Sequence, residues 1–248
     1  MRLLSAELLK VRTTLVPYVL GGVVALLAGI TAAGFVAGDA LGDNPALDLA
    51  QGASFATPFV TVVGILLVTN EYRHGTIAST FLVEPHRERV LAAKLGAALV
   101  AGVVYTAVAA GAIAAVALPW LAARGDALAL DGQALKAAGL LAVLFMLSGA
   151  LGASVGAILR NQVGAIVATL LWFLVIEPLV ALLVALLRGD ISDQAPISKY
   201  LPGAAFNAIV GGSGAHAGLR IGPAIAVGSA WVAALALGGS VAMMRRDP

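Results

Sequence analysis

The chain has 248 residues, of which 60% are hydrophobic and 11% are charged, and its net charge at pH 7 is +2. An average soluble domain has roughly 45–50% apolar and about 25% charged residues, so this composition excludes an ordinary soluble protein. The net charge is too small to indicate nucleic acid binding. The chain has no cysteine, which excludes disulfides, a thiol nucleophile and thiolate metal sites.

Stretches of about 20 mostly apolar residues, the length that crosses a bilayer as a helix, recur between short polar runs. We therefore predict an all-α, polytopic membrane protein that forms a single domain over residues 1–248. Its six transmembrane helices are expected at residues 15–37, 53–69, 95–123, 137–159, 163–187 and 223–244. The third stretch is longer than a span needs, which predicts either a tilted helix or a turn outside the membrane near Pro119.

The basic residues indicate how these helices are oriented. With a cytoplasmic N-terminus, ten of the 15 lysines and arginines fall on the cytoplasmic side. The other five are Arg124, Lys136, Arg188, Lys199 and Arg220. Because cytoplasmic loops carry an excess of basic residues, both termini and the segment 70–94 are predicted to be cytoplasmic.

The first 14 residues precede the first span and carry a basic amphipathic pattern. Leu4, Leu8 and Val11 recur at helical spacing, while Lys10 lies elsewhere on the helical wheel. A helix lying in the inner membrane interface and a plain basic flank that fixes the topology both explain this pattern. The apolar stretch that follows is too long for the core of a secretory signal, so we expect a retained span.

Signals for chemistry within the chain are weak. No G-x-x-x-x-G-K-[ST] sequence, the loop that binds ATP phosphates, is present. The chain itself is therefore not expected to hydrolyse ATP, and we assign it no catalytic residue, cofactor or metal. Its three histidines, His74, His86 and His216, lack the spacing of metal ligands.

Glu177 lies near the middle of the fifth predicted span, where an uncompensated charge costs at least about 2.5–3.5 kcal/mol. The following Pro178 removes a backbone donor, so a local kink is expected. Three interpretations remain open for this intramembrane carboxylate. They are a neutral carboxyl group bonded within the bundle, a proton or substrate site, and a residue at the end of a shorter span.

Residues 188–222 form a long connection rich in Gly, Pro, Ser and Asp before the sixth span. Within it, residues 200–210 are apolar but too few to cross a membrane. We predict an interfacial or partly re-entrant helix for this stretch, on the outer side.

The segment 70–94 holds seven of the 28 charged residues of the chain. Gly75 permits a bend, Thr76 can cap a helix, and the apolar stretch 77–83 stops before Pro85. The pattern predicts a short amphipathic helix that is presented to the cytoplasm and hinged at both ends.

Two explanations compete for this helix. One is a charge cluster that stops transfer through the membrane, with arginines that snorkel to the interface. The other is a docking element for a soluble partner. Ile77, Phe81 and Leu82 would be a poor choice for a solvated turn, which favours docking.

The run E-Y-R-x-G-T, followed by apolar residues, P-x-R and a lysine, resembles the cytoplasmic loop of type 2 ABC transporter permeases, especially the small bacterial exporters of antibiotics and related compounds. The similarity extends to the start LLSAELLKVRTT and to LPGAAF before the last span, so it covers essentially the whole chain. The matching positions of the loop are Glu71, Tyr72, Arg73, Gly75, Thr76, Pro85, Arg87 and Lys94.

The resemblance implies a role for each segment. Residues 1–14 would be an elbow helix, 71–94 a coupling segment that docks into a separate ATPase subunit, and 188–222 the outer loop. A second, smaller contact would lie at residues 160–162. The residues that would shape the coupling helix or its ends are Glu71, Arg73, Gly75, Thr76 and Arg87, and those that would touch the ATPase are Ile77, Phe81 and Leu82.

The resemblance also implies an ATP-driven exporter in the bacterial cell (inner) membrane. The chain would pair with a second copy or a sister permease and with two ABC ATPase subunits that bind ATP and Mg²⁺. It would move a hydrophobic or amphipathic compound across the lipid bilayer by alternating access, with no nucleic acid partner. Two alternatives stay open: a proton-coupled secondary transporter built around Glu177, and a non-transporting membrane anchor for a cytoplasmic protein.

Overall fold

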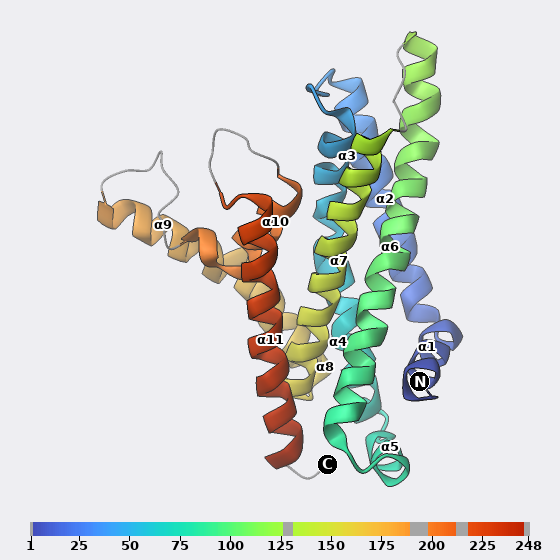
Figure 1. The fold of residues 1–248 in the computed structure, drawn as a ribbon, viewed down its shortest axis with the longest axis vertical. Coiled ribbons are helices and arrows are strands. Elements are labelled where there is room, and N and C mark those ends of the chain that lie inside the picture. Colours follow the sequence, from blue (N-terminus) through green and yellow to red (C-terminus); the bar gives the residue numbers. More distant parts are fainter. Residues whose placement is uncertain (1, 126–130, 189–197, 212–217, 246–248) are drawn as a thin grey trace.

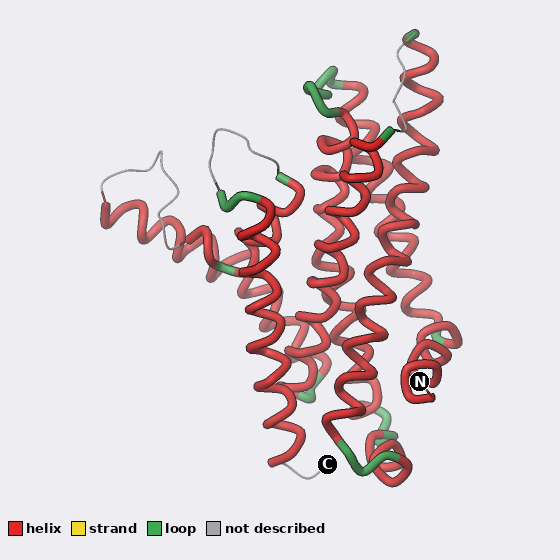
Figure 2. The backbone as a smooth tube through the Cα atoms, in the orientation of Figure 1, coloured by secondary structure: helices red, strands yellow, loops and turns green. Residues whose placement is uncertain are grey.

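The computed structural model describes residues 2–125, 131–188, 198–211 and 218–245 (Figure 1). These residues form an all-helical bundle and include no strand (Figure 2). Six helical stretches are long and apolar enough to cross a membrane. Their bounds are Leu15–Ala37, Pro45–Arg73, Arg87–Arg124, Gly132–Leu159, Gln162–Leu187 and Ile221–Met244. The predicted all-α fold is confirmed, and the six stretches indicate a multi-pass membrane protein.

The described residues form the following α-helices. In chain order they are α1 (Arg2–Thr13), α2 (Leu15–Ala37), α3 (Pro45–Ala53), α4 (Thr57–Arg73), α5 (Ile77–Val83), α6 (Arg87–Arg124), α7 (Gly132–Leu159), α8 (Gln162–Leu171), α9 (Glu177–Arg188), α10 (Pro202–Val210) and α11 (Ile221–Arg245). Three short turns complete them: the 3-10 turns Ser54–Ala56 and Ser198–Tyr200 and the π-helical turn Trp172–Ile176.

Helix α7 is the centre of the bundle and packs against α4, α6 and α11. Its approach to α4 depends on glycine. A Cβ atom on Gly64 would lie 1.9 Å from the carbonyl oxygen of Gly149, and one on Gly152 would lie 2.0 Å from that of Thr61. Lipid removes the usual hydrophobic drive for helix association, so close van der Waals packing of this kind holds the spans together.

Helix α6 is continuous for 38 residues, which at about 1.5 Å per residue gives a length of about 57 Å. Pro119 lies inside the helix, which ends at Arg124 because Gly125 adopts a left-handed conformation with φ +83°. The predicted alternative of a turn near Pro119 was therefore wrong. A single proline disturbs one turn of a helix, and here the helix continues beyond it.

The second span begins earlier than the predicted residue 53, because α3 leads into α4 through a single 3-10 turn. The Asn44 side chain accepts a hydrogen bond from the Leu47 N–H at 3.2 Å, and Pro45 occupies the first helical position. These are ordinary start signals of a helix. A search for hydrophobic stretches misses this start, because α3 contains polar residues.

The short helix predicted within residues 188–222 is confirmed as α10, which starts at Pro202. Phe206, Ile209 and Val210 are buried, and the helix packs against α7 and α11. Residues 189–197 and 212–217 of the predicted outer loop lie outside the described part of the chain.

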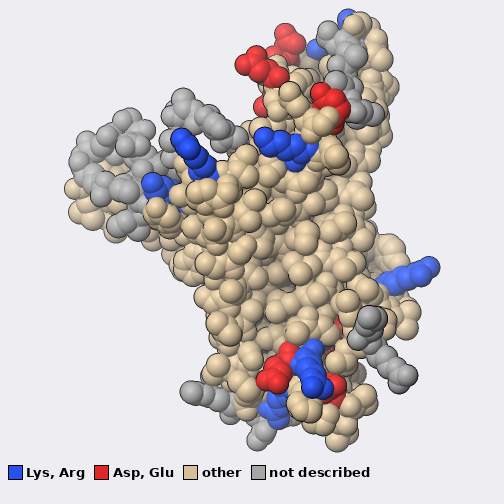
Figure 3. Space-filling model, viewed as in Figure 1, with Lys and Arg blue, Asp and Glu red and all other residues tan. Residues whose placement is uncertain are grey.

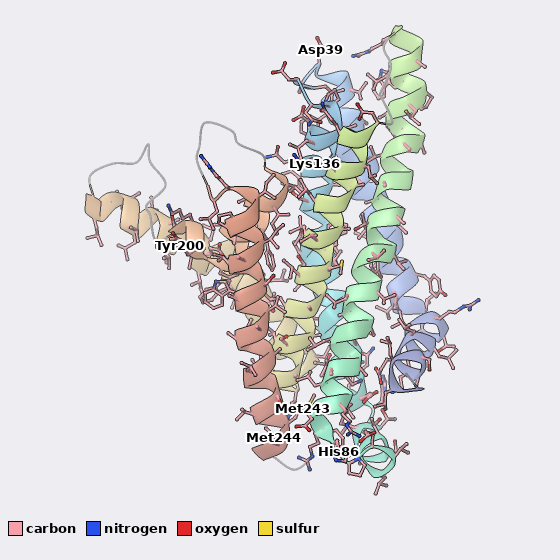
Figure 4. All side chains as sticks on the ribbon, viewed as in Figure 1. Asp39, His86, Lys136, Tyr200, Met243 and Met244 are labelled. Carbon is pink, nitrogen blue, oxygen red and sulfur yellow. The ribbon has the colours of Figure 1, made fainter. Side chains whose placement is uncertain are left out.

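Charged side chains gather at the two ends of the molecule, and a largely uncharged belt separates them (Figure 3). Helices α1 and α5 and the last turn of α11 lie at the same end (Figure 1). We call this the α5 end and include in it residues 160–161, between α7 and α8. His86, Met243 and Met244 mark it in Figure 4, while Asp39 and Lys136 mark the opposite end.

Candidate functional site

Helix α5 is a seven-residue helix set between two turns at the α5 end. Gly75 has φ +68°, a left-handed conformation that glycine adopts without strain, and the N–H of Thr76 then bonds the carbonyl oxygen of Glu71 at 2.9 Å. The predicted bend and the predicted short helix at 77–83 are both confirmed.

The two ends of α5 differ in how closely they follow the sequence signals. Thr76 occupies the N-cap position, but its hydroxyl makes no capping bond, so the predicted side-chain cap was wrong. Its carbonyl oxygen instead accepts bonds from the Thr80 N–H at 3.2 Å and the Ser79 hydroxyl at 2.7 Å. The helix stops where expected, because Glu84 is extended ahead of Pro85.

The apolar side chains of α5 face in different directions. Ile77 is only 4% exposed and holds the helix against the bundle, whereas Leu82 and Val83 are each 84% exposed. Phe81 is half-buried, with the Arg87 guanidinium 5.0 Å from its ring centroid. The outward apolar surface is thus Leu82 with Val83. The expected contact of Ile77 with a partner does not fit this geometry, and Val83 was missed.

Beside α5, a buried lysine on α6 joins two carboxylates from other helices. Lys94 is fully buried, and its ammonium group lies 2.9 Å from Glu7 Oε2 on α1 and 2.8 Å from Glu71 Oε1 on α4. The ammonium group also donates a hydrogen bond to the carbonyl oxygen of Leu67 at 3.0 Å. Three oxygen atoms therefore surround it, two as hydrogen-bond acceptors and the third, from Glu71, as an ion-pair partner.

Lys10, on α1, completes this cluster from the side that faces solvent. Its ammonium group lies 2.8 Å from Glu7 Oε1 and 2.5 Å from Glu71 Oε1. Partial burial opposes the charge of Lys10, but the hydrogen bonds to the two carboxylates outweigh it and raise the pKa of Lys10 above its usual 10.5. We call these two lysines and two glutamates the ionic cluster, and its formal charge is zero.

The ionic cluster connects α1, α4 and α6 to one another beside α5. Thr80 of α5 extends it, because its hydroxyl lies 3.4 Å from Glu71 Oε2, at the long limit of a hydrogen bond. Removing one partner of a buried ion pair typically costs about 3–5 kcal/mol, since the other charge is left buried and unpaired. The cluster therefore fixes the relative positions of these helices.

On the other side of α5, two arginines hold the end of α11. Arg87, the first residue of α6, donates to the carbonyl oxygen of Met243 at 2.6 Å, and Arg160 donates to that of Ala242. Cations are favourable at a helix C-terminus, where carbonyl groups lack partners within the helix. Because Arg87 also covers the Phe81 ring, α5 is connected to the last span as well.

The predicted second contact, at residues 160–162, lies beside the end of α4. Arg73 Nη1 donates to Gln162 Oε1 at 3.1 Å, and the Arg160 guanidinium lies 5.4 Å from the centroid of the Tyr72 ring. Asn161 caps α8, because its side chain accepts a bond from the Gly164 N–H at 3.0 Å. This turn is thus bonded to the segment that leads into α5.

The segment that returns from α5 to α6 carries a local ion pair. Glu84 Oε1 lies 2.9 Å from His86 Nδ1 and 3.9 Å from Arg89 Nη1. The hydrogen bond from the His86 ring, helped by the nearby Arg89, lowers the pKa of Glu84. These residues are on the surface, so the pair orders the turn and adds little to stability.

Glu177 lies far from this end and is held by α10. Its carboxyl oxygens accept bonds from the backbone N–H groups of Gly203 at 3.0 Å and Ala204 at 2.6 Å, at the start of that helix. A helix N-terminus suits a carboxylate. Glu177 is only 8% exposed, so the geometry favours a group bonded within the bundle.

The other interpretations of Glu177 are affected differently. The apolar helical stretch continues past Glu177 to Leu187, but α9 turns away from the bundle at this point, so a shorter span that ends near Glu177 stays a hypothesis (Figure 1). The expected kink is present as the π-helical turn Trp172–Ile176, which directly precedes Glu177 and Pro178. Beyond this turn, α9 runs away from the rest of the bundle (Figure 1). A role in proton or substrate binding remains a hypothesis.

The structure thus gathers at the α5 end all eight residues predicted for coupling, with Glu177 elsewhere. Sequence reasoning missed Glu7 and Lys10 as partners and set Lys94 just outside a span that began at residue 95. One signal was available: Glu7 is the only acidic residue of the first 14, and it lies three positions before Lys10. The partnership of both residues with Lys94 has no local signal. Among the described residues, no group of three His, Asp or Glu side chains could hold a metal ion.

Comparison with known proteins adds no assignment. The sequence matches no protein-family model, and no curated protein is significantly similar to it.

Proposed function

We propose that this chain is the permease subunit of an ATP-driven exporter of the ABC type. In this proposal α5 is the coupling helix, and it receives the motion of a separate ATPase subunit at the cytoplasmic face. The observation that carries the proposal is the combination of an exposed apolar tip, Leu82 and Val83, with a base that contacts Glu71 of α4 and Arg87 of α6. Glu71 in turn pairs with Lys10 of α1, and Arg87 donates to the end of α11.

The exposed tip supports a protein contact. Leu82 and Val83 adjoin each other on α5, which lies at one end of the molecule (Figure 1), and charged side chains gather at that end (Figure 3). Exposed apolar surface at such a place is unfavourable in water, and a small apolar centre within a polar rim is typical of a protein interface. A cluster that only stopped membrane transfer would need the charges and not this tip.

The bonded base supports transmission of force. A push on α5 would reach α1 and α6 through Glu71 and the ionic cluster, and it would reach α11 through Arg87. Helices joined by buried ion pairs move together, because separating the charges is costly. We therefore propose that ATP binding moves α5 with these helices and changes the side on which the permease opens.

The distribution of basic residues supports a proposed orientation. Of the basic residues whose side chains are described, seven belong to the α5 end and four to the opposite end. The seven are Lys10, Arg12, Arg73, Arg87, Arg89, Lys94 and Arg160, and the four are Arg124, Lys136, Lys199 and Arg220. By the positive-inside rule we propose that the α5 end is cytoplasmic, with α1 as an elbow helix at the inner surface.

Other chains would supply the remaining subunits of the exporter. We propose that two ATPase subunits bind ATP and Mg²⁺, and that a second copy or a sister permease completes the transport path in the bacterial cell membrane. Almost none of the fifth span is buried, so its side chains are open to lipid or to that second permease. The proposed cargo is a hydrophobic or amphipathic compound.

Two other functions would use the same residues differently. A proton-coupled transporter would need Glu177 to exchange protons, yet its two backbone donors and its burial suit a fixed role. A non-transporting anchor would bind its partner through the same α5 tip. It differs from a permease because the ATP turnover of the partner would not respond to this chain.

The test first asks whether a Walker-type ATPase is encoded beside this chain, and then co-expresses that ATPase with the chain. We expect Leu82→Asp with Val83→Asp to abolish its co-purification and the stimulation of its ATP turnover, while insertion and stability remain unchanged. Leu135→Asp is the matched control, because Leu135 is 76% exposed and lies at the opposite end. A complex that survives the double substitution contradicts the docking surface. ATP turnover that is the same with and without this chain favours the anchor.

A further inference from the structure

A cavity of about 200 Å³ lies between the fifth span, α7, α10 and α11. It is separate from the α5 end and from the residues used in the proposed function. Its walls are mostly apolar and include three aromatic side chains. Residues that define it are Leu151, Val155, Thr169, Trp172, Phe173 and Trp231.

One polar side chain in this wall has no hydrogen bond. Thr169 is 7% exposed, and its buried hydroxyl has no partner. A threonine inside a helix usually bonds the carbonyl oxygen four residues earlier, as Thr31, Thr61 and Thr106 do in this chain at 2.9–3.0 Å. A buried polar group left without a bond costs about 1–3 kcal/mol, so Thr169 is arranged at some cost to stability.

A second buried polar atom belongs to a residue three positions further along the chain. The indole N–H of Trp172 is buried near the Glu177 carboxylate, but it forms no hydrogen bond of ordinary geometry. Trp231, across the cavity, differs because its indole N–H donates to the carbonyl oxygen of Tyr200 at 2.9 Å. The cavity wall thus holds one hydroxyl without a bond, that of Thr169, while the Trp172 N–H interacts with the Glu177 carboxylate.

The backbone beside the cavity is also irregular. Trp172 is the first residue of the π-helical turn Trp172–Ile176, and Thr169 precedes this turn. Turns of this kind inside α-helices are frequent at functional sites, because they turn side chains away from their regular positions. This distortion is independent of the unbonded hydroxyl and lies at the same place.

We propose that the cavity binds a small aromatic molecule that carries a hydroxyl or carbonyl oxygen, with the oxygen at Thr169. The volume suits this class, since an apolar cavity of about 150 Å³ takes benzene. The walls suit it as well, because aromatic rings pack favourably against Trp172, Phe173 and Trp231. A lipid chain fills the space less well, since it offers no partner to the hydroxyl.

The test measures binding to the purified full chain in lipid nanodiscs, without nucleotide or ATPase. The probe is 1-naphthol, and the matched probe without oxygen is 1-methylnaphthalene. Quenching of tryptophan fluorescence reports occupancy, because two of the three tryptophans of the chain, Trp172 and Trp231, line the cavity. Empty nanodiscs give the partition of each probe into lipid.

We expect saturable binding of 1-naphthol, and Thr169→Val weakens it roughly tenfold, which corresponds to about 1.4 kcal/mol. The same variant leaves 1-methylnaphthalene unchanged. Thr31→Val, at a threonine that is bonded within its own helix, changes neither probe. Val155→Phe fills the cavity and weakens both probes, while elution as a single folded species shows that each variant is intact.

Three results would overturn the inference. They are binding no greater than partition into empty nanodiscs, an equal effect of Thr169→Val on both probes, and full binding of 1-naphthol to Val155→Phe. Because no ATPase takes part, the cavity and the proposed export function succeed or fail separately.

Discussion

Buried polar groups are bonded to one another at the α5 end, whereas near the cavity beside α10 some of them have no hydrogen bond. At the α5 end, the Lys94 ammonium group contacts three oxygen atoms within 3.0 Å and belongs to a cluster without net charge. Near the cavity, the Thr169 hydroxyl and the Trp172 N–H are buried without hydrogen bonds. A fully satisfied polar network rigidifies a structure, whereas a buried polar group without a bond costs free energy that a bonded ligand would recover.

The same contrast appears in the packing of the helices. Helices α4 and α7 meet so closely that glycines are required at their contact, whereas almost none of the fifth span is buried. In the proposed function, the tightly connected helices at the α5 end move as a rigid unit. The fifth span instead faces lipid, a ligand or another permease. Four substitutions test this difference, from the largest expected effect to the smallest.

Lys94→Met should be the most damaging change, because it leaves Glu7 and Glu71 buried with only the half-exposed Lys10 between them. We expect a loss of about 3–5 kcal/mol of stability, measured as a large drop in melting temperature in detergent. Lys94→Met combined with Glu7→Gln and Glu71→Gln should recover part of the loss. A single variant as stable as the native chain would show that the cluster does not fix this end.

Gly203→Ala should loosen α10. The added Cβ would lie 2.8 Å from both carboxyl oxygens of Glu177, which are themselves buried. Overpacking of this kind costs about 1–3 kcal/mol, visible as faster hydrogen exchange in α10. Gly22→Ala is the matched control, because nothing lies within 4 Å of its new methyl group. It should be neutral or slightly stabilising in its helix, since alanine favours helices over glycine.

The substitution Glu177→Gln distinguishes a structural role of this carboxyl group from a role in proton exchange. The amide keeps one oxygen for the two backbone donors of Gly203 and Ala204, so we expect a loss of roughly 1–2 kcal/mol in melting experiments. Export measured in vesicles with ATP should continue at near the native rate. Transport that stops in this variant and also collapses with an uncoupler would favour the proton-coupled alternative.

Lys10 should give the smallest effect, and one that depends on pH. The raised pKa means that Lys10 stabilises the folded state while it is charged, fully below pH 10.5, and that this contribution disappears as pH rises through the folded value. Lys10→Gln should therefore melt slightly below the native chain at pH 8, with the gap closing above pH 10.5. A difference in melting temperature that does not change with pH would show that Lys10 acts through packing and not through its charge.

Local signals explain most of what could be predicted. Gly75 and Pro85 set the bounds of α5, and the length of the apolar stretches gave the spans, because the bilayer makes every spanning segment satisfy its own backbone. Predictions failed where the outcome depends on neighbours. The hydroxyl of Thr76 does not cap, and Ile77 faces inward because the bundle lies on that side.

The sequence by itself determined a helical membrane protein, the position of its charged segment and the short helix within that segment, since these follow from composition and spacing along the chain. Only the tertiary structure decided that Lys94 binds Glu7 and Glu71, that Arg87 reaches Met243, and that Thr169 is left without a bond. Each of these outcomes is the presence or the absence of a contact between side chains or backbone groups that lie apart in the sequence. Their pairing is set by how the helices pack in three dimensions, which no local pattern encodes.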